Sequence, residues 1–554
     1  MSKMTREAKA AREVEVKKPV VNFMGGTSYE INPIDTLKMV TASSIFGEPQ
    51  YYRDGEFEKA RIKDGKLWID RLFEDYSLID SAYKGKKTSE IMEDIIDKAL
   101  DYDFEATINW AVTLRKEFFM RLNPQVIMVR AAIHPKRVVF NETHPGMFSE
   151  INTKVMSRAD EPASQLTYYI YRNGSKKNVP NILKRSWAKK IESLNAYSMH
   201  KYKNSGIGMI DVVRVCHANN KKIDELMKTG SLEVSESDNT WEVLRASGKT
   251  WMEILNSDIT INHMALLRNL RGIFKEIEDI EVCKSVLAKL KEGVLSGKQF
   301  PYRYYTALNA VKNDNKVNHK SLIMDALEEC MDIACDNMPK LKGKTMCLSD
   351  NSGSAWGTCP SEYGSVTIAE IDNLSSVITA RNSEEGYVGK FGDKLKVYPV
   401  GKRNGVLSQA TEITHGRSGD VGGATENGIW LFFKNAIENK EHWDNIFIYS
   451  DQQAGHGGLY GTDREQREYR KSGYCVNGMY VDVAKLIDTY RKEVNPNVNV
   501  FSIQTAGYNN VVIPEYGYRT NIMYGWTGKE LTFADTMIKF WDEKAQSKKK
   551  NKEA

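Results

Sequence analysis

A short apolar segment that runs directly into an acidic, hydroxyl-rich turn constrains the fold of this chain more than any other feature. The segment 345–348 is strand-forming, and Asp350, Ser352 and Ser354 follow it on one turn. This spacing places one carboxylate and two hydroxyls at the carboxyl end of a strand, where open parallel α/β sheets bind ligands. Oxygen ligands of this kind suit a hard cation, Mg²⁺ first and Mn²⁺ or Ca²⁺ next. A helix N-cap accounts for the same residues equally well, because Asp and Ser are common caps.

Two later segments favour a metal site over a cap. A glycine-rich turn at 422–428 opens onto a helical pattern, and an apolar strand pattern at 445–450 is followed by an aspartate. Together the three strand-to-loop junctions supply five oxygen ligands: Asp350, Ser352, Ser354, Thr425 and Asp451. In residue types and order the set resembles the metal-ion-dependent adhesion site of a von Willebrand factor A domain. The resemblance implies a divalent cation whose open coordination position takes a carboxylate from a partner.

The region 341–545 alternates between strand and helix patterns. Strand patterns at 345–349, 394–400, 445–450 and 498–504 are separated by helical patterns at 366–379, 429–438 and 481–494. Such alternation predicts a doubly wound α/β domain, with a mainly parallel sheet covered by helices on both faces. The residues after it, 546–554, form a basic tail that is expected to be disordered.

The region 23–340 is helical in pattern almost throughout, and the charged residues 1–22 before it are predicted to be mobile. Apolar residues recur at helical spacing in segments separated by short connections with Gly, Pro, Asn or Asp. These segments are 91–100, 106–119, 124–133, 182–202, 210–216, 251–255, 263–277, 282–295 and 322–335. Antiparallel helix pairs in series indicate a HEAT-like α-solenoid. Since no regular period is present, a compact helical bundle stays open as the alternative.

Composition describes an ordinary globular protein. The 554 residues are 41% hydrophobic and 27% charged, with a net charge of +5, so the total charge indicates no class of partner. The seven cysteines are scattered without a CxxC pair, which is typical of buried thiols in a reducing cytosol. The sequence shows no signal peptide and no apolar run near the ~20 residues that span a bilayer. We therefore expect a cytoplasmic protein.

Positive charge gathers in one part of the helical region. Between Arg172 and His217 ten residues are basic and two are acidic, an excess of +8 that exceeds the net charge of the whole chain. Tyrosines and Trp187 are interleaved with the basic residues. Lys and Arg neutralise phosphates and aromatic rings stack on unpaired bases, so the stretch favours nucleic-acid binding. A solvated helix face is the alternative, and His217 at the end of an apolar helical turn fits a C-cap.

The same stretch carries a second resemblance. Lys201–Asn204 followed by Asp211–His217, together with the segments 44–52, 123–126 and 158–161, resembles the Ro60 (TROVE-domain) family. Proteins of that family join a ring of helical repeats to a von Willebrand factor A domain, the order expected here. The resemblance covers about 30 to 540 and implies an α-helical HEAT-like repeat ring followed by an α/β doubly wound von Willebrand factor A-like domain.

The resemblance also implies partners and site residues. Family members bind small noncoding Y RNAs on the outer ring surface and thread single-stranded 3′ ends of misfolded RNAs through the hole. By position, the outer RNA surface would include Lys201, Lys203, Arg214 and His217, extended by Lys184, Arg185 and Lys189. Candidates for the inner surface are Arg115, Arg121 and Arg130. Asn204 stands about where an arginine is common in the family, which puts the identity of the RNA in doubt more than RNA binding itself.

Three functions follow as hypotheses. The first is a ribonucleoprotein scaffold for RNA quality control or decay, without chemistry of its own, that meets a protein partner such as an exoribonuclease through its metal site. The second is a metal-dependent protein-binding adaptor in which RNA is incidental. The third is a metal-assisted hydrolase acting on RNA. We expect no enzyme, because His415 and His456 near the metal loops have no paired nucleophile or orienting acid in a recognisable spacing.

Overall fold

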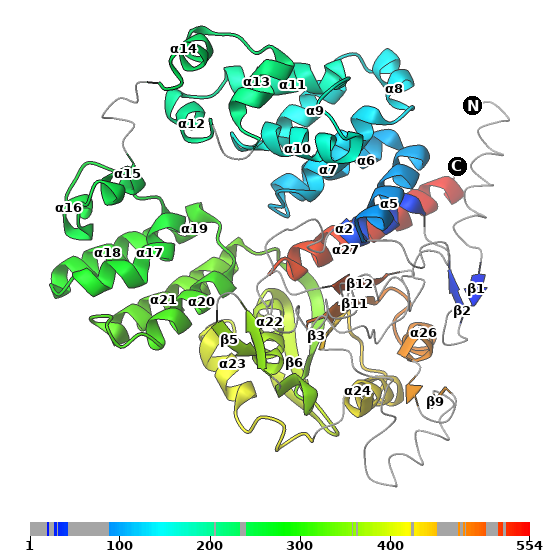
Figure 1. Cartoon of the computed structure of the whole chain (residues 1–554). Coiled ribbons are helices and arrows are strands. Elements are labelled where there is room, and N and C mark those ends of the chain that lie inside the picture. Colours follow the sequence, from blue (N-terminus) through cyan, green and yellow to red (C-terminus); the bar gives the residue numbers. More distant parts are fainter. Residues whose placement is uncertain are drawn as a thin grey trace. The chain divides into compact units, whose positions relative to one another are not determined.

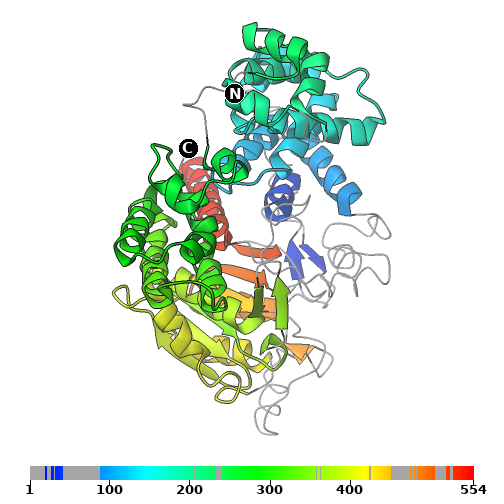
Figure 2. The same ribbon diagram turned by 60° about the vertical axis from the view of Figure 1, so that its left-hand side comes forward.

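The computed structural model describes residues 19–21, 27–29, 32–41, 88–203, 207–232, 240–356, 358–361, 364–422, 426–450, 475–476, 480–481, 483–505, 519–524 and 528–553. Most of these residues fall into two compact units. The first is made of 32–41 and 88–260, and the second contains the described residues from 261 onwards. Figures 1 and 2 show the first unit in blue to green and the second in green to red. The predicted motif segment 44–52 and Asn204 lie outside the described residues.

The first unit is built entirely from helices. Its longer helices are α2 (Pro33–Thr41), α5 (Thr88–Tyr102), α6 (Phe104–Lys116), α7 (Asn123–Ile133), α9 (Met147–Val155), α10 (Glu161–Asn173), α11 (Asn181–Glu192), α13 (Met209–Cys216) and α14 (Lys221–Thr229). Shorter helices are α8 (Arg137–Thr143), α12 (Ala196–Lys201), α15 (Trp241–Ala246) and α16 (Trp251–Leu255). Contacts run from pair to pair along this series, α6 with α7 and α9, α9 with α11, and α11 with α13, which is the pattern of a helical-repeat array.

Local signals explain where these helices begin. Asp103 caps α6 by accepting a hydrogen bond from the Ala106 amide at 2.9 Å. Pro124 and Pro162 lie in the first turns of α7 and α10, where proline costs the helix no hydrogen bond. The expected helix at 182–202 is two helices instead. Ser193–Asn195 separate α11 from α12, because the Asn195 side chain accepts from the Ser198 amide at 2.8 Å and starts a new helix.

A closed polar network lies inside this unit. The amide of Gln165 donates to Gln125 and to Asn152, each at 2.7 Å, while its oxygen accepts from Trp187 Nε1 at 2.7 Å. Asn152 also donates to Ser186 Oγ at 2.7 Å. All five side chains are 0–1% exposed, so the network joins α7, α9, α10 and α11 without leaving these amides unpaired. Such a network fixes how neighbouring helices are paired, because a shift of one helix would leave buried polar groups without hydrogen-bond partners.

The second unit begins with five helices and continues into a sheet. The helices are α17 (His263–Glu276), α18 (Ile280–Glu292), α19 (Val294–Gly297), α20 (Pro301–Lys312) and α21 (Lys320–Ala334). The sheet strands are β3 (Leu341–Asp350), β6 (Ser383–Phe391), β7 (Leu395–Pro399), β8 (Asn445–Ser450), β11 (Asn499–Gln504) and β12 (Thr520–Tyr524). The helices among them are α22 (Ile368–Arg381), α23 (Val406–Thr414), α24 (Glu426–Glu438), α26 (Val483–Glu493) and α27 (Glu530–Glu553). Short strands outside the sheet are β1 (Pro19–Val21), β2 (Thr27–Tyr29), β4 (Thr358–Ser361), β5 (Gly364–Thr367), β9 (Cys475–Val476) and β10 (Tyr480–Val481).

The six-stranded sheet has the order β12-β11-β8-β3-β6-β7. Every neighbouring pair in it is parallel except β6 with β7. The chain leaves β3 through α22 to β6 on one side and later returns to β8 on the other side of β3. The winding direction therefore reverses between β3 and β8, which is the topological switch point of a doubly wound sheet. The expected fold class, a helical-repeat array followed by a doubly wound α/β domain, is confirmed.

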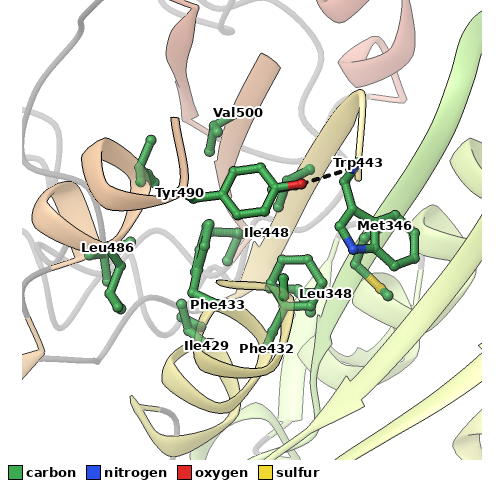
Figure 3. Packing of buried hydrophobic residues seen from close by; sticks show 14 of the residues in the cluster. Met346, Leu348, Ile429, Phe432, Phe433, Trp443, Ile448, Leu486, Tyr490 and Val500 are labelled. Carbon is green, nitrogen blue, oxygen red and sulfur yellow. Dashed lines mark hydrogen bonds between the residues drawn. The ribbon is translucent and has the colours of Figure 1, made fainter. Parts of the chain in front are cut away.

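Apolar cores lie on both faces of this sheet. On one face Leu348 and Ile448 pack against Phe433 of α24 and Tyr490 of α26 (Figure 3). The Tyr490 hydroxyl accepts from the Trp443 amide at 2.8 Å and so ties α26 to the start of β8. On the other face α22 contacts β3, β6 and β8. Five buried thiols, Cys216, Cys283, Cys330, Cys335 and Cys347, are free, as the scattered spacing predicted.

One expectation about the ends of the chain needs correction, and the other falls mostly outside the described residues. Helix α27 continues to Glu553, so the basic run that was expected to be disordered is helical. The run contains neither Pro nor Gly, and four of its nine residues are Lys, a good helix former. Within the segment predicted to be mobile, β1 (Pro19–Val21) pairs with β2 (Thr27–Tyr29). Among the helices that the structure describes, none is both long and apolar enough to cross a membrane.

Candidate metal centre and nucleic-acid interface

Asp350 lies at the carboxyl end of β3, beside the end of β8. The register pairs Ser349 with Tyr449, so Asp350 and Ser450 are the next residues along their two strands. Asp350 is 0% exposed, and its carboxylate oxygens accept from the Ser352 amide at 2.8 Å and from the Ser450 hydroxyl at 2.5 Å. The carboxylate is thus held in one orientation at the switch point of the sheet.

Asp350 and Ser352 fit a hard cation. Both side chains are buried, and they offer a carboxylate oxygen and a hydroxyl oxygen, the donor chemistry that Mg²⁺ and Mn²⁺ prefer. A buried carboxylate is costly to keep ionised without a compensating charge, which a divalent cation supplies. The Ser354 side chain, Thr425 and Asp451 lie outside the described part of the chain, so the five-ligand set stays a prediction. Within the described part, no cluster of three or more His, Cys, Asp or Glu side chains could hold a metal.

A buried network of amide side chains holds the loop that follows β3. Asn351 donates to Asn373 Oδ1 at 2.9 Å and Asn373 donates back to Asn351 Oδ1 at 3.1 Å, while Ser349 donates to Asn373 Oδ1 at 2.6 Å. Asn373 also donates to Thr414 Oγ1 at 3.1 Å, at the end of α23. Because Asn351 and Asn373 are 0% exposed, each bond replaces one that water would otherwise make. The loop after β3 is therefore fixed to α22 and α23.

Lys390 is a fully buried lysine that the sequence analysis missed. It lies in β6 beside Ser349, and its Nζ contacts Asp420 at 2.9 Å and donates to the His415 carbonyl at 2.9 Å. The pKa of Asp420 is lowered; burial raises it, but hydrogen bonds from Lys390 and Lys396 outweigh that effect. Lys390 thus anchors the segment 415–420, which leads to the predicted ligand Thr425. The local sign in the sequence was a lysine within the run 387–391, and this sign does not reveal the partner, Asp420. A buried lysine needs such a partner.

The basic residues of α11 point away from its apolar face. Leu183, Trp187 and Ile191 are buried, whereas Arg185 and Lys189 are exposed and Lys184 is half-buried. The helix therefore buries one stripe against its neighbours and presents its charge to solvent.

Lys201 and Lys203, at the end of α12, are the next basic residues of the stretch, and both already have partners. Lys201 pairs with Glu242 at 3.2 Å and lies over the rings of Tyr197 and Tyr202, with Nζ 5.6 and 6.0 Å from the ring centroids. The pKa of Lys201 is raised; burial lowers it, but the hydrogen bonds to Glu242 and Tyr197 outweigh burial. Lys203 donates to the Gly230 carbonyl at 2.8 Å.

Arg214 and His217 belong to α13 and its end. Arg214 is exposed in the last turn, opposite the buried Val212 and Val213. His217 is the C-cap, with φ 57° in the left-handed region, and its amide donates to the Val213 carbonyl at 2.8 Å. Its backbone therefore fits the cap interpretation, while its exposed ring remains accessible to a ligand.

The three arginines proposed for an inner surface all have carboxylate partners. Arg115 is 8% exposed and pairs with Glu161 at 2.8 Å, so its guanidinium is largely inside the unit. Arg130 pairs with Asp97 and has a side chain that is 14% exposed. Arg121 pairs with Asp160 at 2.8 Å but keeps 44% of its side chain exposed. Of the three, only Arg121 presents much of its guanidinium-bearing side chain to solvent.

Comparison with known proteins shows a likeness to a solved structure. No model of a protein family matches the sequence, and no curated protein matches it. The structure is similar to the crystal structure of the Ro (RSR) protein of Deinococcus radiodurans, with a TM-score of 0.57 and 14% sequence identity over 80% of this chain and 93% of that chain. The resemblance to Ro proteins expected from the sequence is thereby confirmed as a resemblance in fold.

Proposed function

We propose that this protein binds RNA through its helical region and serves as a ribonucleoprotein scaffold in RNA quality control or decay. The observation that carries the proposal is the charged face of α11, α12 and α13 in a chain that shares the Ro fold. Arg185, Lys189, Lys201 and Arg214 are exposed, and α11 and α13 each bury an apolar stripe on the other side of the helix. Side chains of this kind neutralise phosphates, and nearby tyrosine rings can stack on unpaired bases.

The proposed ligands are two kinds of RNA. A small structured noncoding RNA of the Y type would contact the basic face, including Lys184, Lys203 and His217. Single-stranded 3′ ends of misfolded RNA would enter the hole of a helical ring, where Arg121 is the accessible arginine. Since Arg115 is buried against Glu161, it serves this inner surface through packing rather than through a phosphate contact.

The α/β domain has a separate role in this proposal. Asp350 and Ser352, together with the predicted ligands Ser354, Thr425 and Asp451, would hold Mg²⁺. The bound cation would supply positive charge for a partner's carboxylate, with a protein such as an exoribonuclease as the partner. The protein itself performs no chemistry. A metal-dependent adaptor with incidental RNA binding is the second candidate, favoured by the buried and oriented Asp350 carboxylate.

Copurified RNA tests the proposal directly. The protein is purified in low salt, its absorbance is compared at 260 and 280 nm, and any RNA is extracted and sequenced. RNA binding predicts nucleic-acid absorbance that high salt removes, together with recovery of small noncoding RNAs. Protein free of nucleic acid that also fails to bind added structured RNA would leave the adaptor as the better interpretation.

A further inference from the structure

Two lysine ammonium groups from different helices converge on one serine of the helical unit. Lys116 ends α6, and its Nζ donates to Ser157 Oγ at 3.0 Å. Lys190 lies on α11, and its Nζ donates to the Ser157 carbonyl at 3.3 Å. Ser157 follows α9, on which both α6 and α11 pack (Figure 1). Within the described residues, neither lysine has a carboxylate at ion-pair distance.

The charges around Ser157 do not balance. Arg115 pairs with Glu161, and Asp160 is shared by Arg121 at 2.8 Å and Arg158 at 3.1 Å. Together with Lys116 and Lys190, these seven side chains comprise five cations and two carboxylates. The two carboxylates are occupied by the three arginines, so the excess resides mainly on the two lysines.

We propose that Lys116, Lys190 and the Ser157 hydroxyl bind one phosphate group of an RNA backbone. Ammonium groups bind phosphate as point charges, without demanding one fixed geometry, and the exposed hydroxyl supplies a further donor. The site rests on the proposed RNA binding and adds to it a phosphate contact at three residues that the proposed function does not use.

The site is continuous with the charged face of α11 to α13. Arg158, one residue beyond Ser157, donates from Nη2 to the Tyr202 hydroxyl at 3.1 Å. Tyr202 lies between Lys201 and Lys203 in sequence, and its ring is beneath the Lys201 ammonium. An RNA strand that contacts Lys201 therefore has a path of cationic and aromatic side chains leading to Ser157.

The protonation of Lys190 agrees with an anion site. Burial lowers the pKa of Lys190, and the neighbouring charges of Lys116 and Arg115 lower it further, against an opposing effect of Glu161. A phosphate between the two ammonium groups would raise the pKa of Lys190 again. In the free protein Lys190 should therefore react faster with an amine-selective reagent at neutral pH than an ordinary surface lysine, and bound phosphate should slow it.

Ser157→Asp provides the decisive variant, because it places a carboxylate where the phosphate would bind. Ser157 is exposed, so the change should leave the fold intact. The carboxylate should pair with both lysines, so the thermal midpoint of unfolding should be equal to or higher than that of wild type. Affinity for a single-stranded oligouridylate should fall about tenfold or more, because like charges then face each other. The slope of log affinity against log salt should flatten by roughly 0.7, the expectation for one lost phosphate contact on a single strand.

Two controls separate this site from general charge effects. Ser247→Asp adds the same charge to another exposed serine of the unit and should change RNA affinity less than twofold. The pair Lys116→Ala with Lys190→Ala should reproduce the flattened salt slope, whereas Lys98→Ala with Lys136→Ala removes equal charge and should not. RNA affinity that is the same in Ser157→Asp and Ser247→Asp overturns the proposal.

Amine labelling of the full chain, read by mass spectrometry, distinguishes this proposal from the proposed function. Oligouridylate should protect Lys116 and Lys190 but not Lys98 and Lys136. If no RNA binds the wild-type protein, the proposed function fails, and inorganic pyrophosphate still tests the anion site. Protection of both lysines by pyrophosphate supports the site, and no protection by either ligand overturns it.

Discussion

The two candidate sites of this molecule are built in opposite ways. Around Asp350 the polar side chains are buried, and each is held by other protein groups, as in the bonds of Asn351 and Asn373 and the contact of Lys390 with Asp420. On α11 to α13 the charged side chains are exposed, and their partners are single surface groups such as Glu242 and the Gly230 carbonyl. A buried network is rigid and fails as a unit, whereas an exposed face adds many small contributions. Single substitutions should therefore have large effects at the first site and small effects at the second.

The largest effect is expected at the metal loop. Asp350→Ala should weaken Mn²⁺ binding by more than about 100-fold, since even residues that only orient ligands contribute roughly 10–100-fold. RNA affinity should stay within twofold of wild type, because the RNA face is in the other unit. Calorimetry with Mn²⁺ and a filter-binding assay with RNA measure the two quantities. Unchanged Mn²⁺ affinity would return this loop to the helix-cap interpretation.

Lys390→Met should produce the next largest effect, on stability. Removing one partner of a buried pair leaves the other uncompensated and costs about 3 kcal/mol, the low end of the usual range because Asp420 keeps Lys396. When unfolding of the α/β unit in urea is followed by fluorescence, the midpoint should therefore shift to a lower urea concentration. Adding Asp420→Asn should recover part of the loss. If the single variant is as stable as wild type, the buried network is not the rigid unit described above.

The features that were predicted from the sequence depend on neighbouring residues, and those that were missed depend on contacts between distant ones. The strand 445–450 was predicted correctly, because a short apolar run carries that information locally. The break between α11 and α12 was missed, since apolar spacing continues across Asn195 and only its capping bond ends the helix. The contacts of Lys390 and the pairing of Arg115 with Glu161 join residues distant in sequence, so no local pattern could reveal them.

If the contacts of the charged face are additive, RNA affinity should fall in steps as its basic residues are removed. Replacing Lys201, Lys203 and Arg214 together by alanine should flatten the slope of log RNA affinity against log salt by roughly 2 to 3. The three side chains are exposed or half-buried, so circular dichroism and the thermal midpoint should stay close to wild type. Single-stranded 3′ ends should still bind the triple variant if their site is the hole. Equal losses for both RNA types would reduce the face to a nonspecific basic patch.

The smallest effect tests whether the partners on this face compete with RNA. Lys201 and Glu242 have side chains that are 39% and 46% exposed, and exposed pairs of this kind contribute only about 0.2–1 kcal/mol. Glu242→Gln should therefore leave the thermal midpoint nearly unchanged. RNA affinity should rise about two- to threefold at low salt, because Lys201 no longer has to leave a carboxylate and one repulsive charge is gone. The same change in a Lys201→Ala background should have a smaller effect, since only the repulsion remains to be relieved. A gain of equal size in both backgrounds would mean that Glu242 acts through its charge alone, and a loss of affinity would mean that its pairing orients Lys201 for RNA.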